Sequence, residues 1–548
     1  MRNDPGRERS IIFRTLPLLA SFLIADFVLF RLIPGVDTGA QRTLRYAPVL
    51  GLSAVLFVVG LVLTVWPMRP GAASPASGLP RFSARLLFFT ASGSVFFAFL
   101  VGKALVFRLD HESVWKDTQS YAAVAEQSLQ TSEFWAGERS FTLPLIYKLL
   151  GVSRVTLTLE PLKREISGFQ FLLAVAAWTT MAMVTAGALK NRWLGPFTLG
   201  AILGLGLSLD VSLWDRILLT ESIATSLFVL MLALCLFGLL RIGNLRWRRS
   251  WWRYVYLLGL GVIIILYSFA RDTNAYFLAF CAVLMLAGLL LKSVRRRVAL
   301  GPYVLVASLL LALFFVENYT SNQGKRWEFP FFNVLHMRIG PDPSAREFFA
   351  AHGMPVDEAT IDLLTKQRRG FFDALETSQE AQHLVQWVER AGKVTYYRYL
   401  LSRPVASLKA PIDRARNLIS PLSTEYRADD YSIPIWLGLF SRVFFPLPLA
   451  IVLSWLGVLI VAAIILARIE GLGPEWTIPA LLLITVYPMM FVVWHGDAIE
   501  VERHAFQISL QVRLAGWMMT MFLADAWLRR LGTRSALAPP STLSERPA

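Results

Sequence analysis

Apolar residues in this chain gather in long runs that polar stretches separate. A helix needs about 20 residues to cross the hydrocarbon core of a bilayer. About twelve runs reach that length, so the pattern predicts an all-α polytopic membrane protein. The predicted spans lie near residues 11–33, 46–66, 85–108, 168–188, 193–212, 219–240, 254–270, 274–291, 299–317, 443–467, 477–494 and 508–528.

The polar stretches divide the chain into five parts. These are two spans with a Pro/Gly/Ser-rich linker (1–84), a membrane core (85–317) whose first large loop is 109–167, an insertion (318–432), C-terminal spans (433–530) and a tail (531–548). The insertion mixes helical periodicity with Pro and Gly breaks. It predicts either a small domain or a lid lying on the membrane surface.

The distribution of charge predicts which loops lie on which side of the membrane. The chain is 55% hydrophobic and only 17% charged, with a net charge of +16. A soluble protein this basic would suggest nucleic acid. Here the basic residues lie in short loops around 190–192, 241–253 and 292–297 and in the tail, which indicates cytoplasmic loops and excludes a nucleic-acid partner. Both termini are then cytoplasmic.

The residues suited to chemistry fall on the opposite, external side. All six histidines lie there in this topology, together with clusters of acidic and aromatic residues. Cys235 and Cys281 sit inside apolar runs, so the sequence predicts neither a disulfide framework nor a cysteine metal site.

The first candidate is Asp117, just after the third predicted span. One face of a surface helix would hold Tyr121, Val124, Ala125 and Leu129. A carboxylate here can accept the proton of an incoming hydroxyl. It can equally cap the helix that follows, and the two roles are compatible.

Two further helix ends carry candidate residues. Thr220 and Glu221 open a span, where capping and the helix dipole also favour them. Arg216 precedes them and can hold a phosphate or a carboxylate. Arg271 is a phosphate partner of the same kind; the alternative is a solvated turn with Asp272.

The densest candidate precedes the last span. Its residues are His495, Asp497, Glu500, Arg503 and His504. Gln507 and Gln511 continue a stripe from Glu500 and His504, which predicts one helical face. Such polar groups face a bundle interior or a wet cavity, or they lie in the headgroup layer. A divalent cation is compatible with this composition, but the spacing assigns no metal ligand.

Asp117 with Gln119 to Tyr121, the segment 141–150 and the Thr220–Glu221 pair together resemble the GT-C superfamily of membrane glycosyltransferases. Those enzymes take sugars from polyprenyl-phosphate or dolichyl-phosphate carriers. Their catalytic acidic residue lies in the first large external loop. The resemblance covers about residues 85–317. Thr118 stands where many members have a second acidic residue, and two extra spans precede the usual first helix.

The resemblance implies an inverting glycosyltransferase of a bacterial inner membrane that acts on the periplasmic face. Asp117 would be the general base. The donor phosphate would be bound by Arg216, Arg271, Arg503 and His504. Substrate contacts would come from Tyr121, Glu221, His495, Asp497 and Glu500, and from His336 and Arg338 of the insertion. The last two fit an ordinary packed loop equally well. The acceptor would be a lipid, a glycan or a protein, with membrane lipids around the enzyme.

Two other functions fit the same pattern. A lipid-linked oligosaccharide polymerase or ligase also combines about a dozen spans with a large basic external loop. A transporter or flippase predicts charges near the bilayer midplane and broken helices. The polar residues of this chain gather at one face instead, which favours surface chemistry.

Overall fold

The computed structural model describes residues 81–537, except 110–112, 242–243, 245–249, 297–298, 366–370, 372–374, 376–377 and 421–434. The spans predicted at 11–33 and 46–66, with nearly all of the linker and the end of the tail, lie outside the described residues. Within this range the chain forms helices and no strand. The prediction of an all-helical membrane protein is confirmed at that level.

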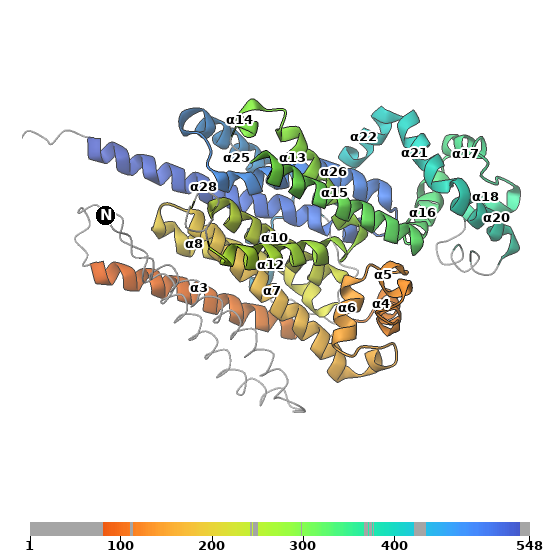
Figure 1. The fold of residues 1–548 in the computed structure, drawn as a ribbon, viewed down its shortest axis with the longest axis horizontal. Coiled ribbons are helices and arrows are strands. Elements are labelled where there is room, and N and C mark those ends of the chain that lie inside the picture. Colours follow the sequence, from red (N-terminus) through yellow and green to blue (C-terminus); the bar gives the residue numbers. More distant parts are fainter. Residues whose placement is uncertain are drawn as a thin grey trace, which may run out of the picture.

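Long apolar helices pack side by side into one bundle (Figure 1). They are α3 (Arg81–Leu109), α7 (Glu160–Ala188), α8 (Gly195–Leu207), α10 (Thr220–Arg241), α12 (Trp252–Ser268), α13 (Asp272–Gly288), α15 (Leu300–Gln323), α25 (Leu449–Glu470), α26 (Thr477–Gly496) and α28 (Phe506–Leu537). Shorter helices of the bundle are α9 (Leu209–Ser212), η3 (Leu213–Arg216), α14 (Lys292–Arg295) and α24 (Ile435–Phe444). Each predicted span from 85–108 onward overlaps one of these helices.

Six helices of the described part are long and apolar enough to cross a membrane, or seven if one bent pair counts as a single span. The other predicted spans coincide with α12 and α13, of 17 residues each, and with α28. A membrane-embedded protein is therefore supported, whereas the number of twelve spans stays a prediction.

Polar loops gather at the two ends of the bundle. At one end the main-chain N–H of Asn191 donates to Asp525 (2.6 Å). At the other, Arg503 pairs with Asp117 and Glu221. We call the second end the loop end. The surface helices α4 (Lys116–Glu126), α5 (Ser132–Ala136) and α6 (Thr142–Leu149) lie there (Figure 1). The loops predicted to share the external side thus meet at one end, and the side that this end faces stays a prediction.

A bend of 54° separates α8 from the α9–η3 segment. The Lys103 ammonium lies in this bend, where it pairs with Asp215 (2.7 Å) and donates to the Gly206 carbonyl (3.1 Å) and the Ser212 hydroxyl (2.9 Å). Backbone polar groups inside a membrane need partners from the protein. Lys103 supplies one, and Asp215 also accepts from Ser222 (2.7 Å) at the start of α10.

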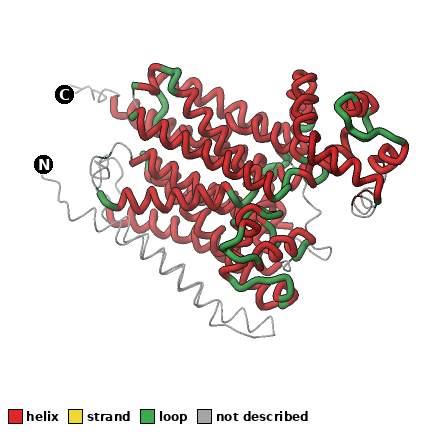
Figure 2. The backbone as a smooth tube through the Cα atoms, turned by 45° about the vertical axis from the view of Figure 1, so that its right-hand side comes forward, coloured by secondary structure: helices red, strands yellow, loops and turns green. Residues whose placement is uncertain are grey.

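The insertion forms a small helical unit that projects beyond the loop end (Figure 2). It contains α16 (Glu328–Val334), η4 (Leu335–Ile339), α17 (Pro343–Ala350), α18 (Glu358–Thr365), α20 (Gln379–Trp387), η5 (Val388–Gly392), α21 (Lys393–Ser402), α22 (Pro404–Asp413) and α23 (Ala415–Ile419). Phe349, Phe371 and Leu384 are fully buried in its own core. Because α15 continues to Gln323, the insertion begins later than the predicted residue 318.

Candidate functional site

Asp117 lies in the first turn of α4, whose apolar face buries Tyr121, Val124 and Ala125. Trp115 occupies the N-cap position, and the Asp117 carboxylate contacts arginines instead. The alternative of a purely capping Asp117 is therefore wrong. The helix ends at Glu126, so the prediction that Leu129 continues its buried face is also wrong; Leu129 is exposed.

Arg503 binds three carboxylates that come from distant parts of the chain. Its Nη1 donates to Asp117 Oδ2 at 2.9 Å and to Glu500 Oε2 at 2.8 Å. Its Nε donates to Oε1 of Glu221, in the first turn of α10. One guanidinium thus joins the first large loop, the start of α10 and the turn before α28.

Two more arginines complete this group. Nη2 of Arg139 donates to Asp117 Oδ1 at 2.8 Å, and its guanidinium carbon lies 4.9 Å from the centre of the Tyr121 ring. Nη1 of Arg271 lies 3.3 Å from Glu221 Oε1. We call these residues the Arg503 cluster: Asp117, Arg139, Glu221, Arg271, Glu500 and Arg503.

The Arg503 cluster is sealed on one side and open on the other. The side chains of Glu221 and Arg503 are 1% and 5% exposed, whereas those of Asp117 and Arg139 are 30% and 31% exposed. Burial alone would raise the pKa of Asp117, but the charges of Arg139 and Arg503 outweigh it and hold this pKa below its ordinary value. The carboxylate is therefore ionised and accessible at neutral pH.

His504 connects the Arg503 cluster to the insertion. Arg271 Nη2 donates to His504 Nδ1 at 2.5 Å. A guanidinium has no acceptor, so Nδ1 accepts this hydrogen bond. Its Nε2–H then donates to Asp497 Oδ2 at 3.2 Å. Asp497 Oδ1 accepts from the Asn333 amide at 2.8 Å.

The predicted single stripe from Glu500 to Gln511 is divided between two helices. α27 (Val501–His504) ends just before α28 begins at Phe506. Gln507 belongs to α28, where it donates to the Tyr267 hydroxyl at 2.5 Å.

Four other predicted site residues have contacts of a structural kind. The guanidinium carbon of Arg216 lies 4.3 Å from the centre of the Phe107 ring on α3. His336 is buried in the insertion, stacks on Phe371 at 4.6 Å, and its Nδ1 lies 2.9 Å from a main-chain carbonyl.

Arg338 donates to the Asp497 carbonyl at 3.0 Å. His495 Nε2 lies 2.9 Å from the Ser407 carbonyl, and the last two contacts therefore help hold the insertion in place.

Sequence reasoning missed Arg139 and a second group of ionic contacts. Arg326 donates through Nε to Asp272 (3.1 Å) and through Nη2 to Glu317 (2.8 Å). Ser140 Oγ lies 2.6 Å from Asp272 Oδ1 and 3.0 Å from Glu317 Oε1. Ser321 donates to Asp272 at 3.0 Å. We call these residues the Arg326 cluster: Ser140, Asp272, Glu317, Ser321 and Arg326.

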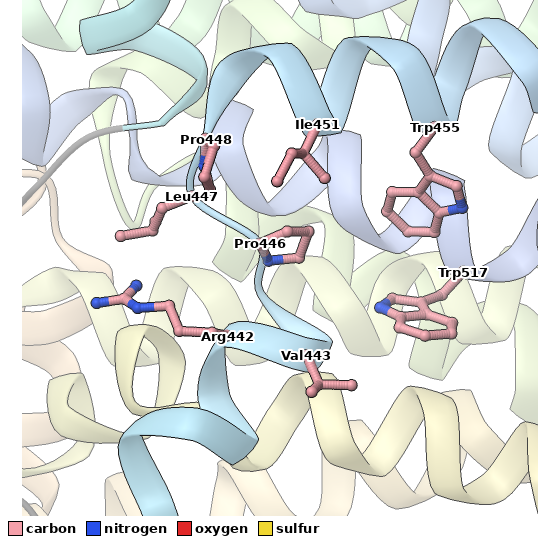
Figure 3. A pocket seen from close by; sticks show the side chains of 8 residues that line it. All are labelled: Arg442, Val443, Pro446, Leu447, Pro448, Ile451, Trp455 and Trp517. Atoms are coloured by element: carbon pink, nitrogen blue, oxygen red, sulfur yellow. The ribbon is translucent and has the colours of Figure 1, made fainter. Parts of the chain in front are cut away.

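An apolar cavity of about 460 Å³ lies between α24, α25 and α28. It is lined by Arg442, Val443, Pro446, Leu447, Pro448, Ile451, Trp455 and Trp517. Figure 3 shows the two tryptophans at one side and Arg442 at the other. Trp517 is 13 residues after His504, or about 20 Å along a helix axis. The cavity thus lies deeper in the bundle than the Arg503 cluster.

In the described ranges, no three His, Cys, Asp or Glu side chains are grouped so that they could hold a metal ion. Comparisons of the chain with protein-family models, with curated proteins and with solved structures found no match. The residues of the site therefore carry the functional conclusion.

Proposed function

We propose that this protein is an integral membrane glycosyltransferase. It transfers a sugar from a polyprenyl-phosphate carrier to an acceptor hydroxyl on the external face of a bacterial inner membrane. The observation that carries the proposal is an accessible, ionised Asp117 bound by Arg139 and Arg503, with Arg271 next to them on Glu221, at the end of apolar helices. A base next to an anion site is what this transfer requires.

The arginines of the Arg503 cluster suit the leaving phosphate. Guanidinium groups bind phosphate oxygens through paired, charge-assisted hydrogen bonds. An entering phosphate competes with the carboxylates for Arg271 and Arg503. Loss of an arginine contact frees an oxygen of Asp117 to act as a base.

The reaction then balances in one step. The acceptor oxygen attacks the anomeric carbon from the face opposite the phosphate, while its proton passes to Asp117. The bond between the anomeric carbon and the phosphate oxygen breaks, and the released polyprenyl phosphate keeps the electron pair. Its growing charge is stabilised by the arginines. The product has inverted configuration at the anomeric carbon.

The hydrocarbon tail of such a donor needs an apolar path. The cavity beside Trp455 and Trp517 offers apolar lining with one cation, Arg442. Because it lies about 20 Å below His504 along α28, a chain whose phosphate sits at the Arg503 cluster is long enough to reach it.

The test uses purified protein in nanodiscs with a panel of radiolabelled polyprenyl-phosphate sugars and candidate acceptors. Wild type and Asp117→Asn are compared for donor binding and for sugar transfer. Asn keeps the size and polarity of the side chain but cannot take the proton. We expect one donor to bind both proteins and only the wild type to turn it over.

Glu126→Gln is the matched control, because Glu126 also lies on α4 and pairs with an arginine, Arg154, outside the cluster. This variant should transfer sugar like the wild type. Normal turnover by Asp117→Asn would refute the role of Asp117. Elongation of lipid-linked oligosaccharides would favour a polymerase or ligase, and movement of the intact donor across the bilayer would favour a flippase.

A further inference from the structure

One surface of the insertion consists of exposed apolar residues that recur with helical spacing. Along α21 and α22, apolar residues recur at steps of 3, 4, 4, 3 and 4, which is the repeat of a helix face. They are Val394, Tyr397, Leu401, Val405, Leu408 and Ile412. We call them the apolar stripe.

The apolar stripe is turned away from the protein. Its six side chains are between 48% and 78% exposed, with Leu401 and Val405 the most exposed. The buried face of the same helices is formed by other residues, among them Tyr396, Ser407 and Pro411. A water-facing helix rarely shows a continuous apolar stripe of this length, and such a surface marks an interaction site.

A polar stripe runs beside the apolar one. It consists of Arg398, Ser402, Ala406, Lys409 and Asp413, spaced by 4, 4, 3 and 4 residues and all exposed. Each helix therefore has one face on the protein, one apolar face and one polar face. Arg398 and Lys409 directly follow the stripe residues Tyr397 and Leu408. Basic residues next to an apolar face are typical of helices that lie in a membrane interface.

Contacts with α26 set the level of α22 in the bundle. The Tyr487 hydroxyl donates to the Leu408 carbonyl at 2.8 Å, and His495 Nε2 lies 2.9 Å from the Ser407 carbonyl. Tyr487 is nine residues before Gly496, the last residue of α26, or about 14 Å inside that end. The middle of α22 is thus beside the last turns of a candidate membrane span.

We infer that the apolar stripe of α21 and α22 inserts into the lipid leaflet at the loop end. Its apolar side chains contact the acyl chains, while Arg398 and Lys409 reach the phosphates of the headgroups. The occupant of this surface is lipid, because Leu408 of the stripe lies beside the last turns of α26, a candidate membrane span, and because the stripe carries cations along one edge. The inference does not depend on the proposed glycosyltransferase activity.

The experiment measures the depth of single nitroxide labels. Cysteine is introduced singly at Leu401, Val405 or Leu408 in a Cys235→Ala, Cys281→Ala background, and the full-length protein is placed in nanodiscs of phosphatidylethanolamine and phosphatidylglycerol. Oxygen, which concentrates in hydrocarbon, and a water-soluble nickel chelate compete to relax each label. Ala406→Cys on the polar stripe is the matched control.

We expect the stripe labels to be relaxed several-fold more by oxygen than by nickel, and the Ala406 label to show the opposite preference. Nickel relaxation at Leu401 and Val405 equal to that at Ala406 would place the stripe in water and overturn the inference. Low relaxation by both reagents would mean that protein covers the stripe. Spin–spin broadening in that case would identify a second copy of the chain.

A second variant separates insertion from folding. Leu401→Glu with Val405→Glu alters only exposed positions, so its unfolding temperature in detergent should match that of the wild type. In nanodiscs the same change should raise the nickel relaxation of a Leu408 label to the level of Ala406. An unchanged Leu408 label would contradict insertion of the stripe.

Discussion

The Arg503 cluster and the Arg326 cluster use the same chemistry and adjacent positions of the chain. Arg139 and Arg271 belong to the first, and their next neighbours Ser140 and Asp272 belong to the second. Each cluster also joins at least two carboxylates to one central arginine. Residue type therefore cannot distinguish them, and the difference must come from their surroundings.

The Arg326 cluster is distinguished by its contacts with the main chain. Arg326 and Glu317 are 5% and 1% exposed, and the Arg326 guanidinium also binds the Gly137 carbonyl at 3.2 Å. A Cβ on Gly324 would lie 1.9 Å from that carbonyl oxygen, so the two backbones are in contact. The Arg326 cluster thus clamps the first loop to the end of α15. The Asp117 and Asp272 side chains are 30% and 36% exposed, so both carboxylates reach the surface, and the backbone contact is what distinguishes the Arg326 cluster.

The largest effect expected from this difference is on turnover. Asp117→Asn and Asp272→Asn each remove one carboxylate that faces an arginine. Asp117→Asn should lower kcat by two to four orders of magnitude, the usual contribution of a general base. Asp272→Asn should keep turnover within about tenfold of the wild type, because Asp272 acts only within the clamp.

Transfer kinetics and thermal unfolding in detergent, measured on the same samples, check this pair. If Asp272→Asn lost turnover as fully as Asp117→Asn at temperatures where it remains folded, the division into an open and a clamping cluster would fail.

The next effect is on stability. Arg326→Met leaves the Asp272 and Glu317 carboxyl groups side by side without their cation, which costs about 3–5 kcal/mol. Adding Asp272→Asn removes the stranded charge and should recover most of the loss. Thermal unfolding of both variants, monitored by size-exclusion chromatography, measures the effect. Arg154→Met is the control, since its exposed pair with Glu126 is worth less than about 1 kcal/mol.

A stability of Arg326→Met equal to that of Arg154→Met would mean that the Arg326 cluster clamps nothing. Equal losses in the single and the double variant would locate the cost in lost packing of the arginine stem instead of in the stranded Asp272 carboxylate.

The Arg503 cluster was easier to predict from the sequence than the Arg326 cluster, for a physical reason. Hydropathy locates the ends of spans, and alternating loops must share a side of the membrane. That argument already groups Asp117, Glu221, Arg271 and Arg503 on one side before any contact is known. It cannot choose the pairs, because the partner of a long arginine side chain depends on tertiary packing, as the missed Arg139 shows.

The argument from hydropathy and loop sides could not predict the Arg326 cluster. Glu317 is the last residue of a predicted apolar span, and α15 continues six residues beyond it to Gln323. The extra turns bring Ser321 and Arg326 back over the carboxylates. Where a helix continues beyond its apolar run, the hydropathy pattern does not show the extra turns. The same limit hid the break at Ala505, since polar periodicity continues across it.

The smallest expected effect is a shift in a pH profile, and it bears directly on the open cluster. The pKa of Asp117 lies below its ordinary value of about 3.9 because Arg139 and Arg503 outweigh the effect of burial. Its ionised form therefore stabilises the fold at pH values above the ordinary pKa, and this contribution is lost as the pH falls through the lowered pKa. Arg139→Met removes one of the two cations and leaves the burial, so the pKa of Asp117 should rise. The acid limb of kcat/KM should move upward by the same amount. Arg139→Lys keeps the charge and should leave the limb in place, and Ser120→Ala, which removes only the hydroxyl that Arg139 Nε binds, should do the same. If the acid limb is unchanged in Arg139→Met, the titrating base is another group. Asp117 would then be a structural carboxylate like those of the Arg326 cluster.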